Sequence, residues 1–591
     1  MTRASVTGPR RGPALRAVAV ALVALVLSTA CAAIPTSGPV RAGDDPGLER
    51  ADLAVPAIGV PPVRGASPED VVRGFLRASA DFVGDHAVAR LYLTPETRAQ
   101  WRASTGTAVY DRVNAPLTAQ AEDDGTVTVR AAEVATIDAE GTFRRTPEGT
   151  EVARTFRMAR VDGEWRIAGL DDGLLLSLVD VQESFRAVSL YFLSRSRNTL
   201  VPDLVLLPEL PGLSTKVVSR LLRGPTSGLR GAVGTAFPQG TSLEVASVPV
   251  RDGLATVGLD ENALRADDDA RERMSAQIVW TLKQLGPDIQ RVRITAAGED
   301  LVVSGVGVEQ GRNAWQTYDP AGLGGVPSVY AVRDGRVGVL IENEFTPVDG
   351  AAGAEGAGVR TPAVSLDEAR VATVSGDGKT VSVGRLVEGT GLRPVLSGGD
   401  FAQPSWDPLG NLWAVDRSTG ALVVLPEGAE TATGVAVPRL PGGRPTGLAV
   451  SRDGARIALT TGSGRDARMV VATVTGVDVL GEGESTVSLV APREVLPDLR
   501  AVRGVAWSSA ETLAVLGSRG GLALRPLDTS IDGYQVREFE PLSELVTLAS
   551  APVEQQGSPL VVGTADGRLE LYTAGRGWLN LGPGSDPAYP G

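Results

Sequence analysis

The apolar and polar positions near the start of this 591-residue chain predict two helices. Each helix start is indicated by a serine or threonine followed by proline and an acid, at Ser67-Pro68-Glu69 and Thr94-Pro95-Glu96. A hydroxyl residue can cap a helix and proline suits its first turn. Apolar residues then follow the first start with helical spacing, at Val71, Phe75 and Phe82.

Strands are predicted to follow these helices. Strands are expected at residues 127–134, 152–161 and 165–167, and an Asp162-Gly163 turn joins the last two. Helices followed by an antiparallel sheet predict an α+β domain over residues 66–182. This segment resembles the nuclear-transport-factor-like cone, a fold with many unrelated functions.

A second α+β segment is predicted over residues 183–310. Its strands are expected at residues 188–192, 204–207, 243–250, 255–259 and 291–295. One helix is expected to be capped by Ser214 and stopped by Gly224-Pro225, and a longer helix to run from about Asp268 to Gly286-Pro287.

From residue 311 to the end, short apolar strands alternate with turn residues. The recurring turns are Arg333–Arg336, Ser365–Glu368, Trp406–Asn411, Ser451–Gly454, Trp507–Ser509 and Ala565–Arg568. Their spacing scatters around roughly 40–50 residues, the length of one four-stranded propeller blade, which predicts about six blades over residues 311–591. The Ser451–Ala458 pattern resembles propellers of the TolB type, and a pair of β-sandwiches is the alternative.

The N-terminus reads as an export signal. Four arginines precede an apolar run from Ala17 to Leu27, which is too short to span a bilayer, since that takes roughly 20 residues. Residues 1–30 are therefore predicted to be a signal peptide cleaved between Ala30 and Cys31. A Pro/Gly-rich stretch over residues 31–65 is expected to be an extended tether.

Cys31 is the only cysteine in the chain. It stands where a bacterial lipobox places the lipid-bearing cysteine, although Ser28 replaces the usual leucine and Leu27 is displaced by one position. The resemblance implies that Cys31 carries an S-diacylglycerol group and an N-palmitoyl group. The protein is then expected to be lipid-anchored in the cell membrane and to face the extracytoplasmic side. An ordinary secreted protein with a stray cysteine is the alternative.

Charge and composition exclude several classes of function. The net charge is −13, and removal of residues 1–30 takes away four arginines and no acid, which gives −17. Such a chain is not expected to bind nucleic acid, which favours basic proteins. His86 is the only histidine, so the chain cannot assemble a Cys/His zinc site, and no metal or cofactor is expected. His86 is predicted to be a solvated loop residue rather than part of a catalytic triad.

Two further motifs are predicted to be structural. The glycine-rich Gly376–Thr380 stretch lacks the first glycine of a phosphate loop, because Thr373 stands in its place, and is expected to form a hairpin turn. The acidic run Asp267–Asp269 lacks the spacing of a calcium loop, and its charges favour the N-terminus of the helix that follows.

Four segments in the second domain resemble the GerMN domain. They are Leu190–Phe192, Leu221–Pro225, Phe237–Thr241 and Gln277–Leu282, in this order. The GerMN domain occurs in spore-germination and cell-envelope lipoproteins, and its role there is thought to be binding.

The order of lipobox, tether, α+β domain, GerMN-like domain and propeller resembles the LpqB lipoprotein family of actinobacteria. That resemblance implies an accessory protein of a two-component system, which binds the extracytoplasmic domain of a sensor histidine kinase and modulates signalling that affects the cell envelope, division and development. A net charge of about −17 would favour a partner with a basic patch.

Two alternatives remain open. The chain could bind cell-wall glycan, including peptidoglycan, with the propeller as a scaffold. It could also be an enzyme, since some propellers cleave glycans with carboxylates alone, although no catalytic residue is identified and no enzymatic activity is expected. Two acids with raised pKa values that face each other would favour the enzyme.

Overall fold

The computed structural model describes Thr2 and residues 58–591, apart from residues 197, 322–326, 342–343, 477–485, 541, 543 and 553–557. Residues 50–591 form one compact unit. The predicted signal peptide, Cys31 and most of the predicted tether lie outside the described residues. The last part of that stretch hydrogen-bonds to the first domain, since Gly59 N–H donates to Asp81 and the Tyr92 hydroxyl donates to the Val60 carbonyl.

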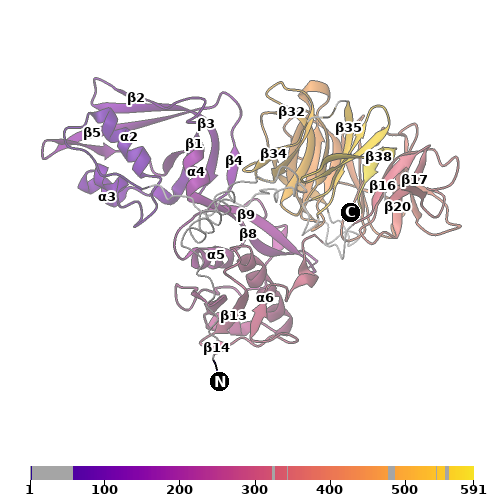
Figure 1. The fold of residues 1–591 in the computed structure, drawn as a ribbon, viewed down its shortest axis with the longest axis horizontal. Coiled ribbons are helices and arrows are strands. Elements are labelled where there is room, and N and C mark those ends of the chain that lie inside the picture. Colours follow the sequence, from indigo (N-terminus) through magenta and orange to yellow (C-terminus); the bar gives the residue numbers. More distant parts are fainter. Residues whose placement is uncertain are drawn as a thin grey trace. The chain divides into compact units, whose positions relative to one another are not determined.

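The first domain is a mixed sheet covered by helices (Figure 1). The sheet has the order β6-β5-β3-β1-β7, with β2 and β4 also paired to β3, and only the β1–β7 pair in it is parallel. The helices are α2 (Pro68–Ala78), α3 (Pro95–Gln100) and α4 (Leu178–Ser184), with short 3₁₀ turns at Ala89–Tyr92 and Ala103–Thr105. The strands are β1 (Gly106–Tyr110), β2 (Thr118–Ala121), β3 (Thr126–Asp138), β4 (Phe143–Arg145), β5 (Glu151–Val161), β6 (Glu164–Gly169) and β7 (Leu174–Ser177).

Both predicted helix starts are confirmed. The Ser67 hydroxyl accepts the Asp70 N–H, and Thr94 accepts the Thr97 N–H. Helix α2 buries Val71 and Phe75 against the sheet but ends at Ala78, so the expected continuation to Phe82 is wrong. The chain turns away after Ser79, and Phe82 lies in the following loop, where it packs on Phe185.

The second domain contains two sheets and two helices. The sheets have the orders β10-β8-β9 and β11-β12-β13-β14, with β15 added to β13. The helices are α5 (Leu213–Leu222) and α6 (Asp268–Lys283), with 3₁₀ turns at Glu261–Arg265 and Gln316–Tyr318. The strands are β8 (Phe185–Ser194), β9 (Leu200–Pro208), β10 (Val233–Gly234), β11 (Val250–Arg251), β12 (Leu254–Leu259), β13 (Arg291–Ala296), β14 (Glu299–Asp300) and β15 (Glu309–Gly311).

Two local predictions in this domain are wrong. Ser214 does not cap α5, because the helix begins at Leu213 and its N-cap residue is Gly212, which has a left-handed backbone (φ 81°). The Ser214 hydroxyl donates instead to the Val248 carbonyl. The strand expected at residues 243–250 does not form. The β-pairing in this stretch consists of an isolated bridge between Leu243 and Leu259 and the two-residue strand β11. Pro249 lies in this stretch and has no backbone N–H, so it cannot donate a hydrogen bond to a neighbouring strand. The predicted start of α6 at Asp268 is confirmed, and the Asp267 side chain caps it by accepting the Ala270 N–H.

The β8–β9 hairpin contributes to the cores of all three domains. Most of its side chains lie in the second domain's core, Phe185 and Leu206 belong to the first domain's core, and Leu204 packs against a propeller core. Polar contacts accompany this packing, since the Tyr191 hydroxyl donates to Glu511 and the Arg456 guanidinium donates to the Pro202 carbonyl.

The remaining chain forms six four-stranded antiparallel sheets, whose inner strands contact one another in sequence. The predicted class of α+β segments followed by a propeller is therefore confirmed. The strands are β16 (Val329–Arg333), β17 (Arg336–Ile341), β18 (Glu344–Pro347); β19 (Val359–Val364), β20 (Arg370–Ser375), β21 (Thr380–Arg385), β22 (Arg393–Ser397); β23 (Ser405–Trp406), β24 (Leu412–Asp416), β25 (Ala421–Leu425), β26 (Thr433–Gly434); β27 (Pro445–Val450), β28 (Arg456–Thr461), β29 (Arg468–Thr475), β30 (Ser488–Glu494); β31 (Leu499–Trp507), β32 (Thr512–Arg519), β33 (Arg525–Ser530), β34 (Val536–Glu538); β35 (Leu545–Ser550), β36 (Leu560–Thr564), β37 (Arg568–Thr573), β38 (Gly577–Pro583) and β39 (Ser585–Ala588), with one 3₁₀ turn at Gly464–Asp466.

The last strand closes the ring. β39 pairs with β16, so the first sheet is made from both ends of the propeller segment, and β39 also contacts β19 and β35. A closed ring leaves no unpaired inner edge that another chain could extend. Gly591 also contacts the second sheet of the ring, since its N–H donates to the Val364 carbonyl.

Carboxylates hold many of the propeller turns. In Ser365, Ser375, Ser451, Ser530 and Thr564, the hydroxyl donates to an aspartate two residues later. The Gly376–Thr380 motif lies at one of these turns, between β20 and β21, which confirms the hairpin prediction.

Asp407 is a buried turn carboxylate that accepts four hydrogen bonds. It accepts hydrogen bonds from the Leu409 and Asn411 N–H groups, the Asn411 amide and the Trp413 indole, and Trp413 is fully buried. Burial raises the Asp407 pKa, while the Trp413 and Asn411 bonds oppose that rise. The carboxylate therefore fixes both the turn and a core side chain.

We expect Asp407→Ala to lower the free energy of unfolding of the propeller by about 3 kcal/mol, because four donors lose their acceptor and three of these hydrogen bonds are buried. Scanning calorimetry should show a lower unfolding temperature. Exposed Asp466 offers a matched control, and Asp466→Ala should change stability by less than about 0.5 kcal/mol. Equal effects of the two substitutions would contradict this role of Asp407.

Candidate functional site

The residues predicted to carry the lipid anchor, Ala30 and Cys31, lie outside the described residues, so cleavage and lipidation stay predictions. Among the helices that the structure describes, none combines the length and apolar character needed to cross a membrane.

His86 is buried, so the prediction of a solvated histidine is wrong. Its side chain is 4% exposed and lies between the rings of Phe82, at 4.6 Å, and Trp101, at 5.8 Å. Burial lowers the His86 pKa, which favours the neutral ring, while the Asp85 charge and hydrogen bonding to the backbone of Ser79 and Asp81 oppose this shift. The neighbouring Asp85 carboxylate pairs with Arg90 instead. A catalytic triad would need a carboxylate bonded to the imidazole, and none is described here.

Several propeller acids have raised pKa values, the property that would favour an enzyme. Burial raises the pKa of Asp453 and Asp532, and both side chains belong to the Ser-x-Asp turns described above. Each residue is only 3% exposed, so a glycan cannot reach it. Burial also raises the pKa of Asp528 to about 6, next to Arg537. The positions of Asp453 and Asp532 are explained by turn formation.

Metal binding finds no support in the part of the chain that is described, where no three His, Cys, Asp or Glu side chains gather in a group that could hold an ion.

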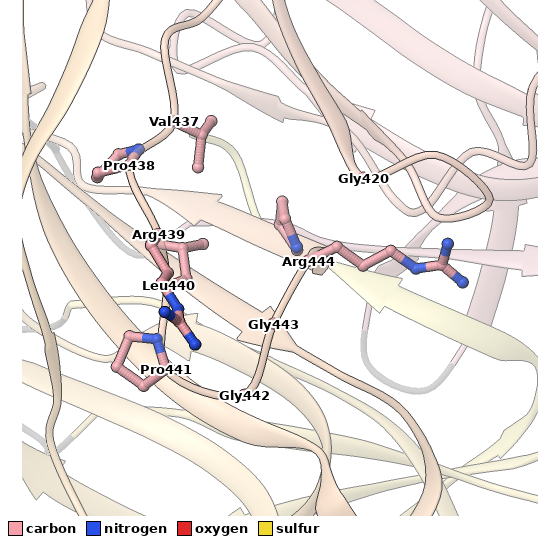
Figure 2. Close-up of a pocket in the computed structure, with 10 residues that line it drawn as sticks. Gly420, Val437, Pro438, Arg439, Leu440, Pro441, Gly442, Gly443 and Arg444 are labelled. Atoms are coloured by element: carbon pink, nitrogen blue, oxygen red, sulfur yellow. The ribbon is translucent and has the colours of Figure 1, made fainter.

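A hollow of about 700 Å³ opens on the propeller between β26 and β27 (Figure 2). It is lined by Val437–Pro445 and by Gly420 from the β24–β25 turn. Gly420 has a left-handed backbone (φ 79°), and a Cβ there would lie 2.6 Å from the Arg444 Cβ, so this close approach requires glycine. The hollow therefore depends on a turn that only glycine fits.

Two arginines give this hollow its chemistry. Arg444 donates to the Ser418 carbonyl, and Figure 2 shows its side chain directed away from Arg439. Arg439 is exposed and has no hydrogen bond or ion pair to any described residue. Prolines and the apolar side chains of Val437 and Leu440 flank it. Such a surface can offer a guanidinium to a carboxylate or phosphate and apolar contact beside it. The proline and glycine content of this stretch is typical of any surface loop, so the stretch carries no sequence signal of a binding surface.

Three family models match the chain. The model described as "Lipoprotein LpqB, N-terminal domain" matches residues 61–182, "Sporulation and spore germination" matches residues 189–302, and "Lipoprotein LpqB beta-propeller domain" matches residues 335–590. Among solved structures, the chain is similar to TolB from Acinetobacter baumannii, with a TM-score of 0.34 and 16% identity over 44% of this chain and 66% of that one. The first GerMN domain of GerM from Bacillus subtilis gives a TM-score of 0.19 and 16% identity over 22% of this chain and 98% of that one.

Curated relatives match over nearly the whole length. Lipoprotein LpqB of Thermobifida fusca (strain YX) is 35% identical, with 97% of this chain and 98% of the relative covered. Lipoprotein LpqB of Streptomyces coelicolor is 30% identical, with 99% of both chains covered. These proteins bear the name of a lipoprotein and not of an enzyme. The chain belongs to the LpqB lipoprotein family.

Proposed function

We propose that this protein is a lipid-anchored lipoprotein on the extracytoplasmic side of the cell membrane. In this proposal it binds the extracytoplasmic domain of a sensor histidine kinase and modulates signalling that affects the cell envelope, division and development. The observation that carries the proposal is the likeness to the LpqB lipoprotein of Thermobifida fusca over 97% of the chain and 98% of that relative.

The anchor follows from the N-terminal sequence. Cys31 directly follows a basic and apolar leader, and an S-diacylglycerol group plus an N-palmitoyl group supply three acyl chains. Two or more chains hold a protein stably at a membrane. The folded unit would then act close to the membrane, within reach of a membrane-embedded kinase.

The hollow at Val437–Pro445 is our candidate for the kinase-binding surface. Arginine beside apolar contact area is typical of the residues that contribute most to protein interfaces. Arg439 is available for such a contact, because no described residue engages its guanidinium. A carboxylate of the kinase would be its partner.

A glycan-binding function is the second candidate. It is favoured by the match of residues 189–302 to the sporulation and spore germination model. Retention of the protein on purified cell wall in the absence of the kinase would support it.

We expect Cys31→Ser to release the protein from the membrane, because serine cannot form the thioether that holds the diacylglycerol. The measurement is fractionation of cells that produce each form, combined with intact-mass analysis of the purified protein. The unsubstituted chain should sediment with membranes and carry the added lipid mass. An unsubstituted chain with an unmodified Cys31 would refute the anchor.

We expect residues 32–591 to bind the extracytoplasmic domain of the cognate kinase with saturable heat in titration calorimetry. Arg439→Glu should weaken this binding at least tenfold, because the reversed charge repels the carboxylate of the partner. Arg465→Glu makes the same charge change at another exposed arginine of the propeller and should leave the affinity within twofold.

The outcomes test the location of the kinase-binding surface separately from kinase binding itself. Binding that is unaffected by Arg439→Glu would move the kinase-binding surface away from the hollow. No detectable heat at high protein concentration would reject the kinase as a partner and favour the glycan-binding function.

A further inference from the structure

A second cleft, of about 700 Å³, lies where the first domain meets β9 and α5. Ligand sites in proteins commonly have volumes of about 300–1,000 Å³. Apolar side chains from the first domain, from the β8–β9 hairpin and from the β9–α5 loop line it. They are Phe82, Leu174, Phe185, Leu206, Leu207 and Leu210.

Aromatic rings form one end of this lining. Phe82 packs edge-on against Phe185 at 5.1 Å and lies 4.6 Å from the ring of His86, which also lines the cleft. Because His86 is favoured in its neutral form by burial, this end of the cleft suits an apolar group.

Cations also line the cleft. Lys216, Arg220 and Arg223 are spaced by four and three residues on α5 and its C-terminal cap, which places them on one face. Arg220 is already engaged, since it donates to the Gly224 and Glu140 carbonyls. The side chains of Lys216 and Arg223 have no hydrogen bond or ion pair to any described residue.

The acids around the cleft do not neutralise these two cations. Asp85 pairs with Arg90, and Glu140 pairs with Arg230 and accepts the Ser227 N–H. Asp138 accepts the backbone N–H groups of Glu140 and Thr142. A protein with a net charge of −13 therefore presents two free cations beside an apolar cleft.

We propose that this cleft binds an anionic amphiphile, whose apolar chain lies against the Phe82 and Leu206 side and whose carboxylate or phosphate pairs with Lys216 and Arg223. The apolar lining contributes through burial of the chain, and the cations select the charged head. This inference does not depend on the proposed kinase binding.

The electrostatics of Lys216 agree with an anionic head. Partial burial of the Lys216 ammonium lowers its pKa, because the charged form loses solvation. A nearby anion stabilises the charged form, so ligand binding should raise this pKa again.

Titration calorimetry of residues 50–591, the compact unit, with dodecanoate and with dodecyl phosphate tests the proposal. We expect saturable binding of one molecule per chain for at least one of them, below its micelle concentration. The neutral 1-dodecanol and inorganic phosphate should each bind at least tenfold more weakly, because each lacks one half of the recognised chemistry. Equally tight binding of 1-dodecanol would overturn the assigned role of the cations.

Two variants locate the ligand. Lys216→Glu combined with Arg223→Glu should weaken binding at least tenfold. The control is Arg251→Glu combined with Arg265→Glu, which reverses the charge of two exposed arginines of the same domain that lie outside the cleft. This control should leave the affinity for the amphiphile within twofold. Leu210→Trp, at a half-buried position, should also weaken binding by filling the cleft. No saturable binding of either amphiphile, or binding unchanged in both cleft variants, would overturn the proposal.

Vesicles of phosphatidylglycerol distinguish the source of the ligand. Displacement of bound dodecanoate by lipid from these vesicles would support a membrane phospholipid as the ligand. Retention of dodecanoate in their presence would support a soluble acid or phosphate ester of the same chemistry.

Discussion

The buried β8–β9 hairpin is the constraint on which the folded unit depends. Its two strands pair along their full length, from Phe185 with Pro208 to Leu193 with Leu200. Side chains of this one hairpin enter the cores of the first domain, the second domain and the propeller. Because interiors are close-packed, a change in the hairpin is felt by all three.

The polar contacts of this hairpin add geometric specificity to the packing. Arg456 is 5% exposed. Its guanidinium donates to the Pro202 carbonyl and forms an ion pair with Asp453, with 3.7 Å between a guanidinium nitrogen and a carboxylate oxygen. Buried charges are tolerated only when they are paired and hydrogen-bonded, so such groups contribute more to a unique arrangement than to net stability. The same arrangement brings β9 and α5 next to the first domain, where the amphiphile cleft lies.

Local signals in the sequence predicted much of the fold. Helix caps such as Ser67 and Thr94 and the turn motifs of the propeller depend on neighbours within a few residues, so they could be recognised in the sequence. The incorrect predictions concern groups whose environment is non-local. His86 is buried by Trp101 and Phe82, and the Ser214 hydroxyl is taken by the Val248 carbonyl.

Neither candidate surface could be recognised from the sequence, for the same reason. The cleft combines Phe82 with Leu206 and Lys216, which are far apart in the sequence, and the spacing on α5 by itself describes an ordinary solvated face. The hollow depends on the approach of Gly420 to Arg444. Only the three-dimensional arrangement shows which charged groups are already paired.

The pairing of β39 with β16 has a consequence for the order of folding. A ribosome makes Tyr330 long before its partner Ala588, so the first sheet keeps an open edge until almost the whole chain has been synthesised. Contacts between residues so distant in sequence form late, because closing a long loop costs chain entropy before any contact compensates for it. During that interval the exposed edge of β16 can pair with another chain. Protection of the nascent chain from aggregation is therefore most needed before its last strand has emerged.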